Sequence, residues 1–249
     1  MSRLISIRVF PACLIAVVLA SAAVRAEVTY WDLPFSDDLR DAGWRLHTPR
    51  GKQPAEFSVA DGDVLSVSAQ SAVSFLYREV PKAARDASGL SWTWRVDQDI
   101  PPTDLSTPGA DDRPFAVHVY FDDRDAGLLR RFAGLFGLPA GGRALTYVWG
   151  GDRPQGTMIA NPFMANGQGA LVVVRPSSLD DIGTDWETVR VDLAGDYRRI
   201  FNREPVPLRG IAISSDTDDT ATSARGRIKN VFLTSDSAAI SGSGSDRRH

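Results

Sequence analysis

An acidic run near the C-terminal end of the chain holds the residues whose types and spacing could do chemistry. It reads G-I-A-I-S-S-D-T-D-D-T, so a short apolar strand leads directly into Asp216, Asp218 and Asp219. Carboxylates at this spacing supply the oxygen ligands that Ca²⁺ takes in protein loops. Asp111 or Asp112, which precede another strand candidate, could complete the set. We therefore predict a Ca²⁺ site formed by Asp216, Asp218 and Asp219 together with Asp111.

An ordinary turn is the alternative interpretation of the same run. Aspartate side chains in turns commonly accept hydrogen bonds from their own backbone. Several carboxylates in one loop repel each other unless a cation offsets them, and Arg113 or Arg225 could supply that cation. The residues alone leave the metal site and the arginine-neutralised turn as equal hypotheses.

Other catalytic motifs are absent from the sequence. It contains no G-x-S-x-G, no H-E-x-x-H, no Walker loop and no G-x-G-x-x-G. The histidines are His47, His118 and His249, and the one cysteine is Cys13. A histidine-rich zinc site and an acyl-transfer hydrolase are therefore unfavoured.

Two strand candidates would position possible ligand-binding side chains. The segment 115–121 alternates apolar and less apolar residues, which places His118 on the less apolar face. The segment 144–149 places Tyr147 and Trp149 on one face, where large rings could stack on a ligand. The predicted ligand-binding residues are Tyr147, Trp149, His118 and Asp112.

The rest of the chain predicts an all-β fold. Segment 57–67 carries an Asp-Gly turn between alternating residues, which indicates a hairpin. Segment 90–96 places Trp92, Trp94 and Val96 on one face, which favours core packing over a sugar platform. About ten short strands with turns between them predict a two-sheet antiparallel β-sandwich of the jelly-roll type.

One or two short helices interrupt the strand pattern. Leu128, Phe132, Leu135 and Phe136 form one apolar stripe within segment 127–138. We expect this helix to close one end of the sandwich, with a lid or a membrane-touching element as the alternatives. A second short helix is expected over residues 196–201.

The two ends of the chain are expected to lie outside the folded domain. Residues 1–26 combine early arginines, an apolar run and a small-residue exit, which is the pattern of a secretory signal peptide cleaved between Ala26 and Glu27. An uncleaved anchor is the alternative. Residues 27–235 then form one β-sandwich domain, and residues 236–249 form a disordered tail. The mature protein is expected to be periplasmic or secreted, with no membrane span.

Composition limits the partners. The formal net charge of the chain is −3, and a mildly acidic protein is a poor candidate for binding the phosphate backbone of nucleic acids. The only cysteine lies in the expected signal peptide, so the exported domain is expected to fold without disulfides.

Several blocks of the sequence together resemble a known family. They are L-S-W-T-W-R-V, D-D-R-P-F-A-V-H-V-Y-F, A-L-T-Y-V-W-G, N-P-F, D-Y-R-R-I-F and the acidic run, in this order between Phe35 and Leu233. This order is similar to the bacterial family DUF3047, a domain of unknown function. The resemblance implies an exported bacterial protein and no particular activity. The outline F…D…G-W followed by W-x-x-V-x-V-D-L is also similar to jelly-roll carbohydrate-binding modules.

Three functional hypotheses follow. The favoured one is a non-catalytic module that binds a carbohydrate or another cell-envelope ligand. The second is an enzyme acting on polysaccharide, with Asp112 and Asp216 as general acid and base. The third is a structural or partner-binding envelope protein, with segment 127–138 as its contact element.

Overall fold

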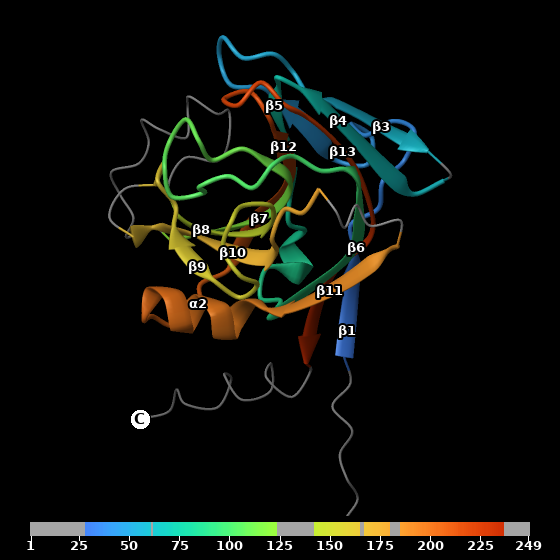
Figure 1. Ribbon diagram of the computed structural model, residues 1–249. Helices are drawn as coiled ribbons and strands as arrows, with labels where there is room; N and C mark the ends of the chain where they lie inside the picture. Colours follow the sequence, from blue (N-terminus) through green and yellow to red (C-terminus); the bar gives the residue numbers. More distant parts are fainter. Residues whose placement is uncertain (1–27, 61, 124–141, 165–166, 180–184, 237–249) are drawn as a thin grey trace, which may run out of the picture.

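Two β-sheets stack face to face in the computed structural model (Figure 1). The structure describes residues 28–60, 62–123, 142–164, 167–179 and 185–236. The expected signal peptide, the helix expected over residues 127–138 and residues 237–249 of the expected tail lie outside these residues. In Figure 1 the β3–β4 hairpin lies at one end of the sandwich and helix α2 at the other.

The first sheet, sheet A, has six strands and the second, sheet B, has seven. Sheet A runs β11 (Glu187–Asp192), β6 (Gly89–Gln98), β13 (Ser223–Asp236), β4 (Val64–Gln70) and β3 (Glu56–Ala60), and β1 (Val28–Asp32) also pairs with β13. Sheet B runs β2 (Trp44–His47), β5 (Val73–Glu79), β12 (Leu208–Asp216), β7 (Arg113–Phe121), β8 (Arg143–Trp149), β10 (Gly169–Arg175) and β9 (Met158–Ala160). The predicted two-sheet sandwich is thereby confirmed.

One pair of strands departs from the antiparallel prediction. Strands β8 and β10 are parallel, whereas every other described pair is antiparallel. The chain leaves β8, forms β9 at the sheet edge and returns through a hairpin, so β10 fills the gap between β9 and β8. The alternation of apolar and polar residues indicates where the strands lie, but it does not show which strand a returning strand pairs with.

Alternating side chains from both sheets build the core. Trp92, Trp94 and Val96 of β6 are buried as predicted, and they face Phe115 and its alternate neighbours on β7. Because side chains of a strand alternate between its two faces, the remaining positions of both strands point outward. This parity decides which residues are available for function.

The short helix expected near residues 196–201 is present as α2 (Leu193–Phe201). The side chain of Asp192 accepts a hydrogen bond from the backbone N–H of Gly195 at 2.9 Å, which caps the first turn. Tyr197 is buried and its ring centroid lies 4.7 Å from that of Phe121, which fixes the helix to sheet B. A 3-10 turn, η1 (Lys82–Ala84), is also present. No helix in the described part of the chain is long and apolar enough to cross a membrane.

Candidate functional site

The acidic run predicted to bind Ca²⁺ forms a turn where β12 meets β7. Strand β12 ends at Asp216, whose backbone pairs with Arg113 at the start of β7. The two acidic segments of the sequence are therefore neighbours, as the metal hypothesis required. The cluster joins Asp111 and Asp112 to the carboxylates that follow Asp216.

Asp112 holds the turn together. Its carboxylate accepts hydrogen bonds from the Thr220 hydroxyl at 2.5 Å, from the Thr220 N–H at 2.8 Å and from the Asp219 N–H at 3.3 Å. The residue is 0% exposed. Both of its carboxylate oxygens accept hydrogen bonds from backbone and hydroxyl donors of residues 219–220, as the turn hypothesis expects.

Arg113 lies between two of the predicted metal ligands. Its guanidinium forms ion pairs with Asp111 at 3.2 Å and with Asp216 at 3.4 Å. Burial raises the pKa of the Asp216 carboxyl well above its usual range, and the charge of Arg113 only partly opposes this. Burial also raises the pKa of Asp111, and the charge of Arg113 again opposes this shift. Arg113 is thus the internal cation that the turn hypothesis anticipated.

A lysine from a distant loop neutralises the exposed half of the cluster. One carboxylate oxygen each of Asp112, Asp218 and Asp219 lie within 4.8 Å of one another, a grouping that could hold a metal ion. The Lys52 ammonium, however, contacts Asp218 and lies 3.4 Å from Asp219. The hydrogen bond to Asp218 raises the pKa of Lys52. In the structure this ammonium stands in the position of a counter-cation.

The enzymatic hypothesis requires Asp112 and Asp216 to face one open cleft. Asp112 is fully buried and its oxygens are engaged by the turn. A general base must reach the proton that it abstracts, and the hydrogen bonds of the Asp112 carboxylate go to residues 219–220. The geometry therefore gives Asp112 a structural role, whereas one carboxylate oxygen of the partly buried Asp216 has no hydrogen-bond partner among the described residues.

The outer face of sheet B carries an aromatic cluster that contains His118. Its rings are those of Phe75, Tyr77, His118 and Tyr120, with centroid distances of 5.3 Å for Phe75–His118 and 6.0 Å for Tyr77–Tyr120. His118 is 5% exposed, and its ring nitrogens hydrogen-bond the hydroxyls of Thr146 at 3.0 Å and Ser214 at 2.8 Å. Burial lowers the pKa of His118 well below its usual value, so the ring is neutral.

Tyr77 brings a buried hydroxyl to this cluster. Its hydroxyl finds no hydrogen-bond partner among the described residues, although the residue is only 7% exposed. Burial raises the pKa of Tyr77 to about 12. The ring lies over Gly210, where an added Cβ would stand 2.2 Å from a ring carbon, so a glycine is required beneath it. The alternation of residues in β7 predicted which face of the strand carries His118, but it did not predict that Phe75 and Tyr77 of β5 would lie beside it.

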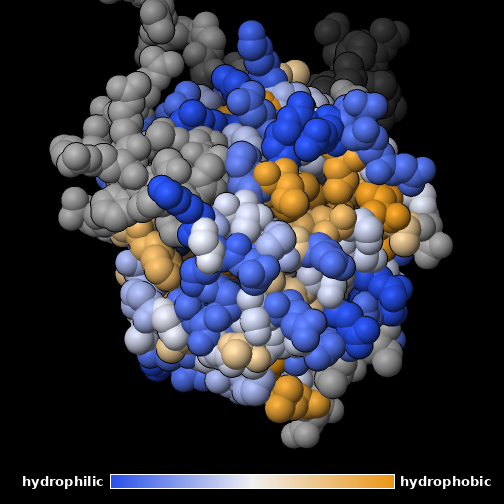
Figure 2. All heavy atoms as spheres, turned by 90° about the horizontal axis from the view of Figure 1, so that it is seen from above, coloured by the Kyte–Doolittle hydropathy of each residue, from blue (hydrophilic) through white to orange (hydrophobic). Residues whose placement is uncertain are grey.

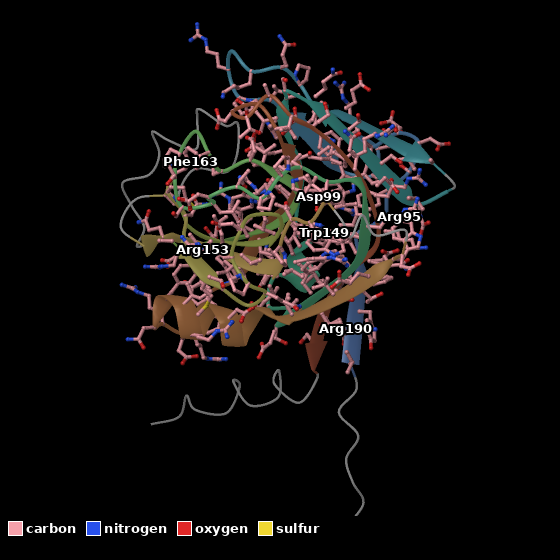
Figure 3. The ribbon with its side chains drawn as sticks, in the orientation of Figure 1. Arg95, Asp99, Trp149, Arg153, Phe163 and Arg190 are labelled. Atoms are coloured by element: carbon pink, nitrogen blue, oxygen red, sulfur yellow. The ribbon has the colours of Figure 1, made fainter. Side chains whose placement is uncertain are left out.

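Tyr147 and Trp149, predicted to contact ligand, lie in the core instead. They are 0% and 1% exposed, because their strand positions face sheet A. Tyr147 donates its hydroxyl to Asp196 at 2.8 Å, and Trp149 donates its indole N–H to the buried Asp99 at 3.2 Å (Figure 3). Neither ring face is open to a ligand. The alternation correctly predicted that Tyr147 and Trp149 share one face of the strand, but it did not show that this face points into the core.

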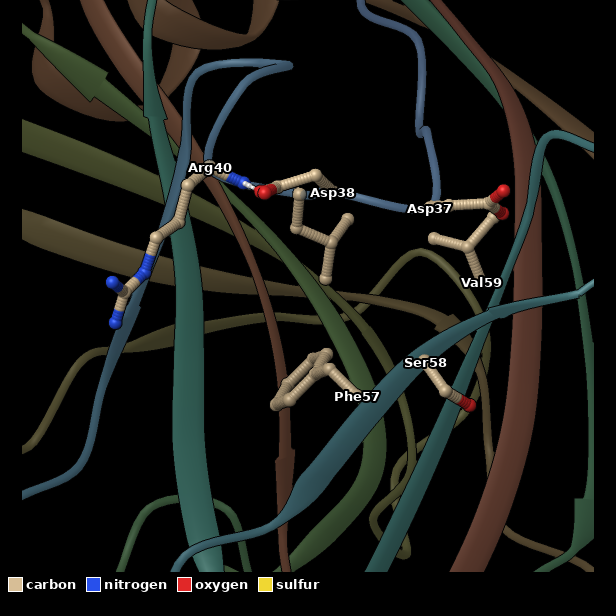
Figure 4. Close-up of a pocket in the computed structure, with 7 residues that line it drawn as sticks. Asp37, Asp38, Arg40, Phe57, Ser58 and Val59 are labelled. Carbon is tan, nitrogen blue, oxygen red and sulfur yellow. Dashed lines mark hydrogen bonds between the residues drawn. The ribbon is translucent and has the colours of Figure 1, made fainter.

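An open groove lies between the loop before β2 and the edge strand β3 (Figure 4). Its volume is about 600 Å³. It has an apolar floor and a charged rim, and the lining residues are Asp37, Asp38, Leu39, Arg40, Phe57, Ser58 and Val59. Seen from above, most of the described surface is hydrophilic; the largest group of apolar side chains lies toward the upper right, with smaller groups elsewhere (Figure 2).

The loop side of the groove is rigidly built. The Asp38 carboxylate accepts hydrogen bonds from the N–H groups of Arg40 at 2.8 Å and Asp41 at 3.2 Å. At the loop ends the rings of Phe35 and Trp44 stack at 5.1 Å, and the Trp44 indole donates to the Pro34 carbonyl at 2.9 Å. The sequence analysis missed this groove, because the pairing of a loop with a distant edge strand leaves no local pattern.

The comparison with protein families identifies the family of this chain. The profile of the family described as "Protein of unknown function (DUF3047)" matches residues 42–232. The chain belongs to the DUF3047 family. This confirms the family resemblance read from the sequence blocks. No curated protein sequence matches this DUF3047 member at a significant level.

Solved structures similar to this DUF3047 protein share little sequence with it. A family 29 carbohydrate-binding module is 12% identical, with 86% of this chain and 90% of that chain covered and a TM-score of 0.39. A family 11 module from Clostridium thermocellum in complex with a β-1,3-1,4-mixed-linked tetrasaccharide is 10% identical, with 84% and 96% covered and a TM-score of 0.40. The xyloglucanase domain of NopAA from Sinorhizobium fredii is 8% identical, with 85% and 97% covered and a TM-score of 0.42.

Removal of Lys52 should convert the acidic cluster into a cation-responsive site. In Lys52→Gln the carboxylates of Asp218 and Asp219 lose the ammonium group that offsets their charge. They then repel each other, and a bound divalent ion would reduce this repulsion. We expect millimolar Ca²⁺ to raise the melting temperature of this variant and to leave that of the wild-type protein unchanged. Calorimetry with Ca²⁺ and with chelator measures both. A wild-type shift would show that Ca²⁺ itself, not Lys52, is the native counter-ion.

The neutral His118 should make stability depend on pH. Its folded-state pKa lies below the unfolded value of about 6.5, so the unfolded chain binds more protons at lower pH and stability falls as pH drops through 6.5. The loss approaches roughly 1.4 kcal/mol per pH unit below that point. In His118→Asn this contribution should be missing, so the fall in stability from pH 7.5 to 5.5, measured by urea unfolding, should be smaller than in the wild-type protein.

The raised pKa of Asp216 acts in the opposite direction, but it is present in both proteins and cancels in the comparison. Burial also lowers the pKa of the partly buried His47, but less than that of His118, so the comparison variant His47→Asn should lose less of the pH dependence than His118→Asn. Equal slopes in wild type and His118→Asn would contradict the assignment.

Proposed function

We propose that this protein is an exported, non-catalytic module that binds a neutral carbohydrate in the groove beside β3. The observation that carries the proposal is an open, preformed cavity with Phe57 in its floor and the charged side chains of Asp37 and Arg40 on its rim. Sugar rings present an apolar face and a rim of hydroxyls. The Phe57 ring could pack against the apolar face of a sugar, and the Asp37 carboxylate could accept hydrogen bonds from its hydroxyls.

The polar groups of the rim support recognition of hydroxyls. Among the described residues, Asp37 forms no hydrogen bond or ion pair, so its oxygens are available as acceptors. Hydrogen bonds to an ionised group are stronger than those between neutral partners. Arg40 adds donors at the other side of the loop, as Figure 4 shows. A cavity of about 600 Å³ lies in the size range of small-ligand sites.

Preorganisation supports the same function. Loop residues 37–40 are fixed by the Asp38 turn and by the Phe35–Trp44 stack, so little ordering remains to be done when a ligand binds. Export is the further part of the proposal, and it rests on the signal-peptide pattern of residues 1–26. A module of this kind would meet its glycan in the cell envelope or outside the cell.

Binding should depend on Phe57 and Asp37. We expect Phe57→Ala to weaken binding of a neutral oligosaccharide by about tenfold or more, since about 1.5–3 kcal/mol accompanies burial of such a ring. Isothermal titration with cello-, manno- and mixed-linkage gluco-oligosaccharides measures the affinity. Because Phe57 also packs partly on the core, the exposed Asp37→Asn provides a second variant that leaves packing intact.

Tyr30 is 66% exposed on β1, outside the groove, so Tyr30→Ala is the matched aromatic control and should bind like wild type. The proposal fails if no neutral oligosaccharide binds the wild-type protein. It also fails if Phe57→Ala and Asp37→Asn both keep full affinity.

A further inference from the structure

The outer face of sheet A carries a concentration of positive charge. On β6 the tryptophans face the core, so Arg95 points to the opposite side (Figure 3). On β13 the buried Ala224 and Ile228 face the core, so the alternate positions point outward. We call the resulting cluster the basic patch, and it consists of Arg95, Arg225, Arg227 and Lys229.

The register places like charges directly across from each other. Arg227 of β13 lies opposite Arg95 of β6, an arrangement that destabilises a sheet unless something offsets it. One carboxylate does so, because Asp97 contacts Arg95 at 2.7 Å and Arg227 at 3.1 Å. A single negative charge thus serves two guanidiniums.

The other two cations are held by neutral groups. The Arg225 side chain donates to the amide oxygen of Gln98 at 3.1 Å. The Lys229 ammonium lies 4.3 Å from the ring centroid of Trp186, and the Arg95 guanidinium lies 5.5 Å from the same centroid. Within the described parts of the chain, neither Arg225 nor Lys229 forms a salt bridge with a carboxylate. Their positions are fixed while their charges stay uncompensated.

This excess is opposite in sign to the protein as a whole. The chain has a formal net charge of −3, yet the basic patch holds four cations, and within the described residues Asp97 is the carboxylate that pairs with two of them. Strand geometry spaces Arg225, Arg227 and Lys229 about 7 Å apart along one line of β13. Guanidinium groups bind carboxylates with paired hydrogen bonds, and a regular row of cations fits a polymer that repeats its negative charge.

We propose that the basic patch binds a carboxylate-bearing polysaccharide, a polyuronate, along β13. The patch shares no residue with the groove beside β3, so this inference stands on different side chains from the proposed function. The two sites would allow one module to contact a neutral and an acidic glycan.

Nucleic acid and membrane fit the patch less well. Binding of single strands without sequence preference uses aromatic rings on which bases stack. Trp186 is the aromatic ring that Arg95 and Lys229 both approach, so its π-surface is already engaged by cations. Duplex DNA carries one negative charge per about 1.7 Å of helix axis, which is much denser than the spacing of about 7 Å between the outward cations of β13. A membrane-surface site would add an apolar face for insertion, whereas the patch is charged and hydrogen-bonded.

Affinity electrophoresis with polygalacturonate tests the proposal, and the fully methyl-esterified polymer is the matched probe with the same backbone and no charge. The wild-type protein should be retarded by the acid polymer only, and less so as salt is raised. The double variant Arg227→Gln, Lys229→Gln should lose about tenfold or more in affinity. Arg153→Gln, an exposed arginine on the opposite side of the molecule, should behave like wild type (Figure 3).

Three outcomes would overturn the proposal. They are equal retardation by the methyl ester, full retardation of the double variant, and an equal loss in Arg153→Gln. Vesicles with anionic lipid and a single-stranded oligonucleotide serve as competing probes, and binding of either in place of polygalacturonate would also reject it. Unchanged melting of the double variant excludes misfolding. If the double variant still binds a neutral oligosaccharide, the binding site proposed in the groove is intact, so a negative result with polygalacturonate concerns the basic patch alone.

Discussion

The aromatic layer between the two sheets is the constraint on which the rest of the structure depends. The Trp94 ring lies 5.3 Å from Trp92, 5.6 Å from Trp149 and 5.9 Å from Phe115, so rings of both sheets interlock. The layer is dense enough that Gly226 of β13 has no room for a side chain, because an added Cβ would stand 2.6 Å from the Phe115 ring. Interiors packed at this density fix the distance and register of the layers.

The direction of the outward side chains on β6 and β7 follows from that layer through strand parity. Once the rings of β6 face inward, Arg95 must face outward, and once Phe115 and its alternates face inward, His118 must lie on the outer face of sheet B. A one-residue slip of β6 would bury Arg95 and expose the tryptophans. The same packing energy therefore holds the core together and places the outward charges.

The sequence predicted the fold class and most strands because alternation is a local signal. The hairpin at residues 57–67, the core role of Trp92 and Trp94 and the short helix α2 were all read correctly. The parallel pairing of β8 and β10 and the inward direction of Tyr147 were not, since both depend on which sheet a strand joins. Local periodicity tells which residues share a face, and tertiary pairing decides which face that is.

Charge pairing explains what local reasoning could not reach at the acidic turn. Lys52 lies 166 positions before Asp218 in the chain, so no spacing rule could have named it as the counter-ion. Lys52 and Arg113 supply two cations to the five carboxylates of the acidic cluster, so the protein itself offsets part of this negative charge. At the basic patch the balance is reversed, and among the described residues Asp97 is the carboxylate that pairs with Arg95 and Arg227. Lys52 and Arg227 both contact carboxylates that lie far away in the sequence, so these pairings follow from the tertiary fold and not from local spacing.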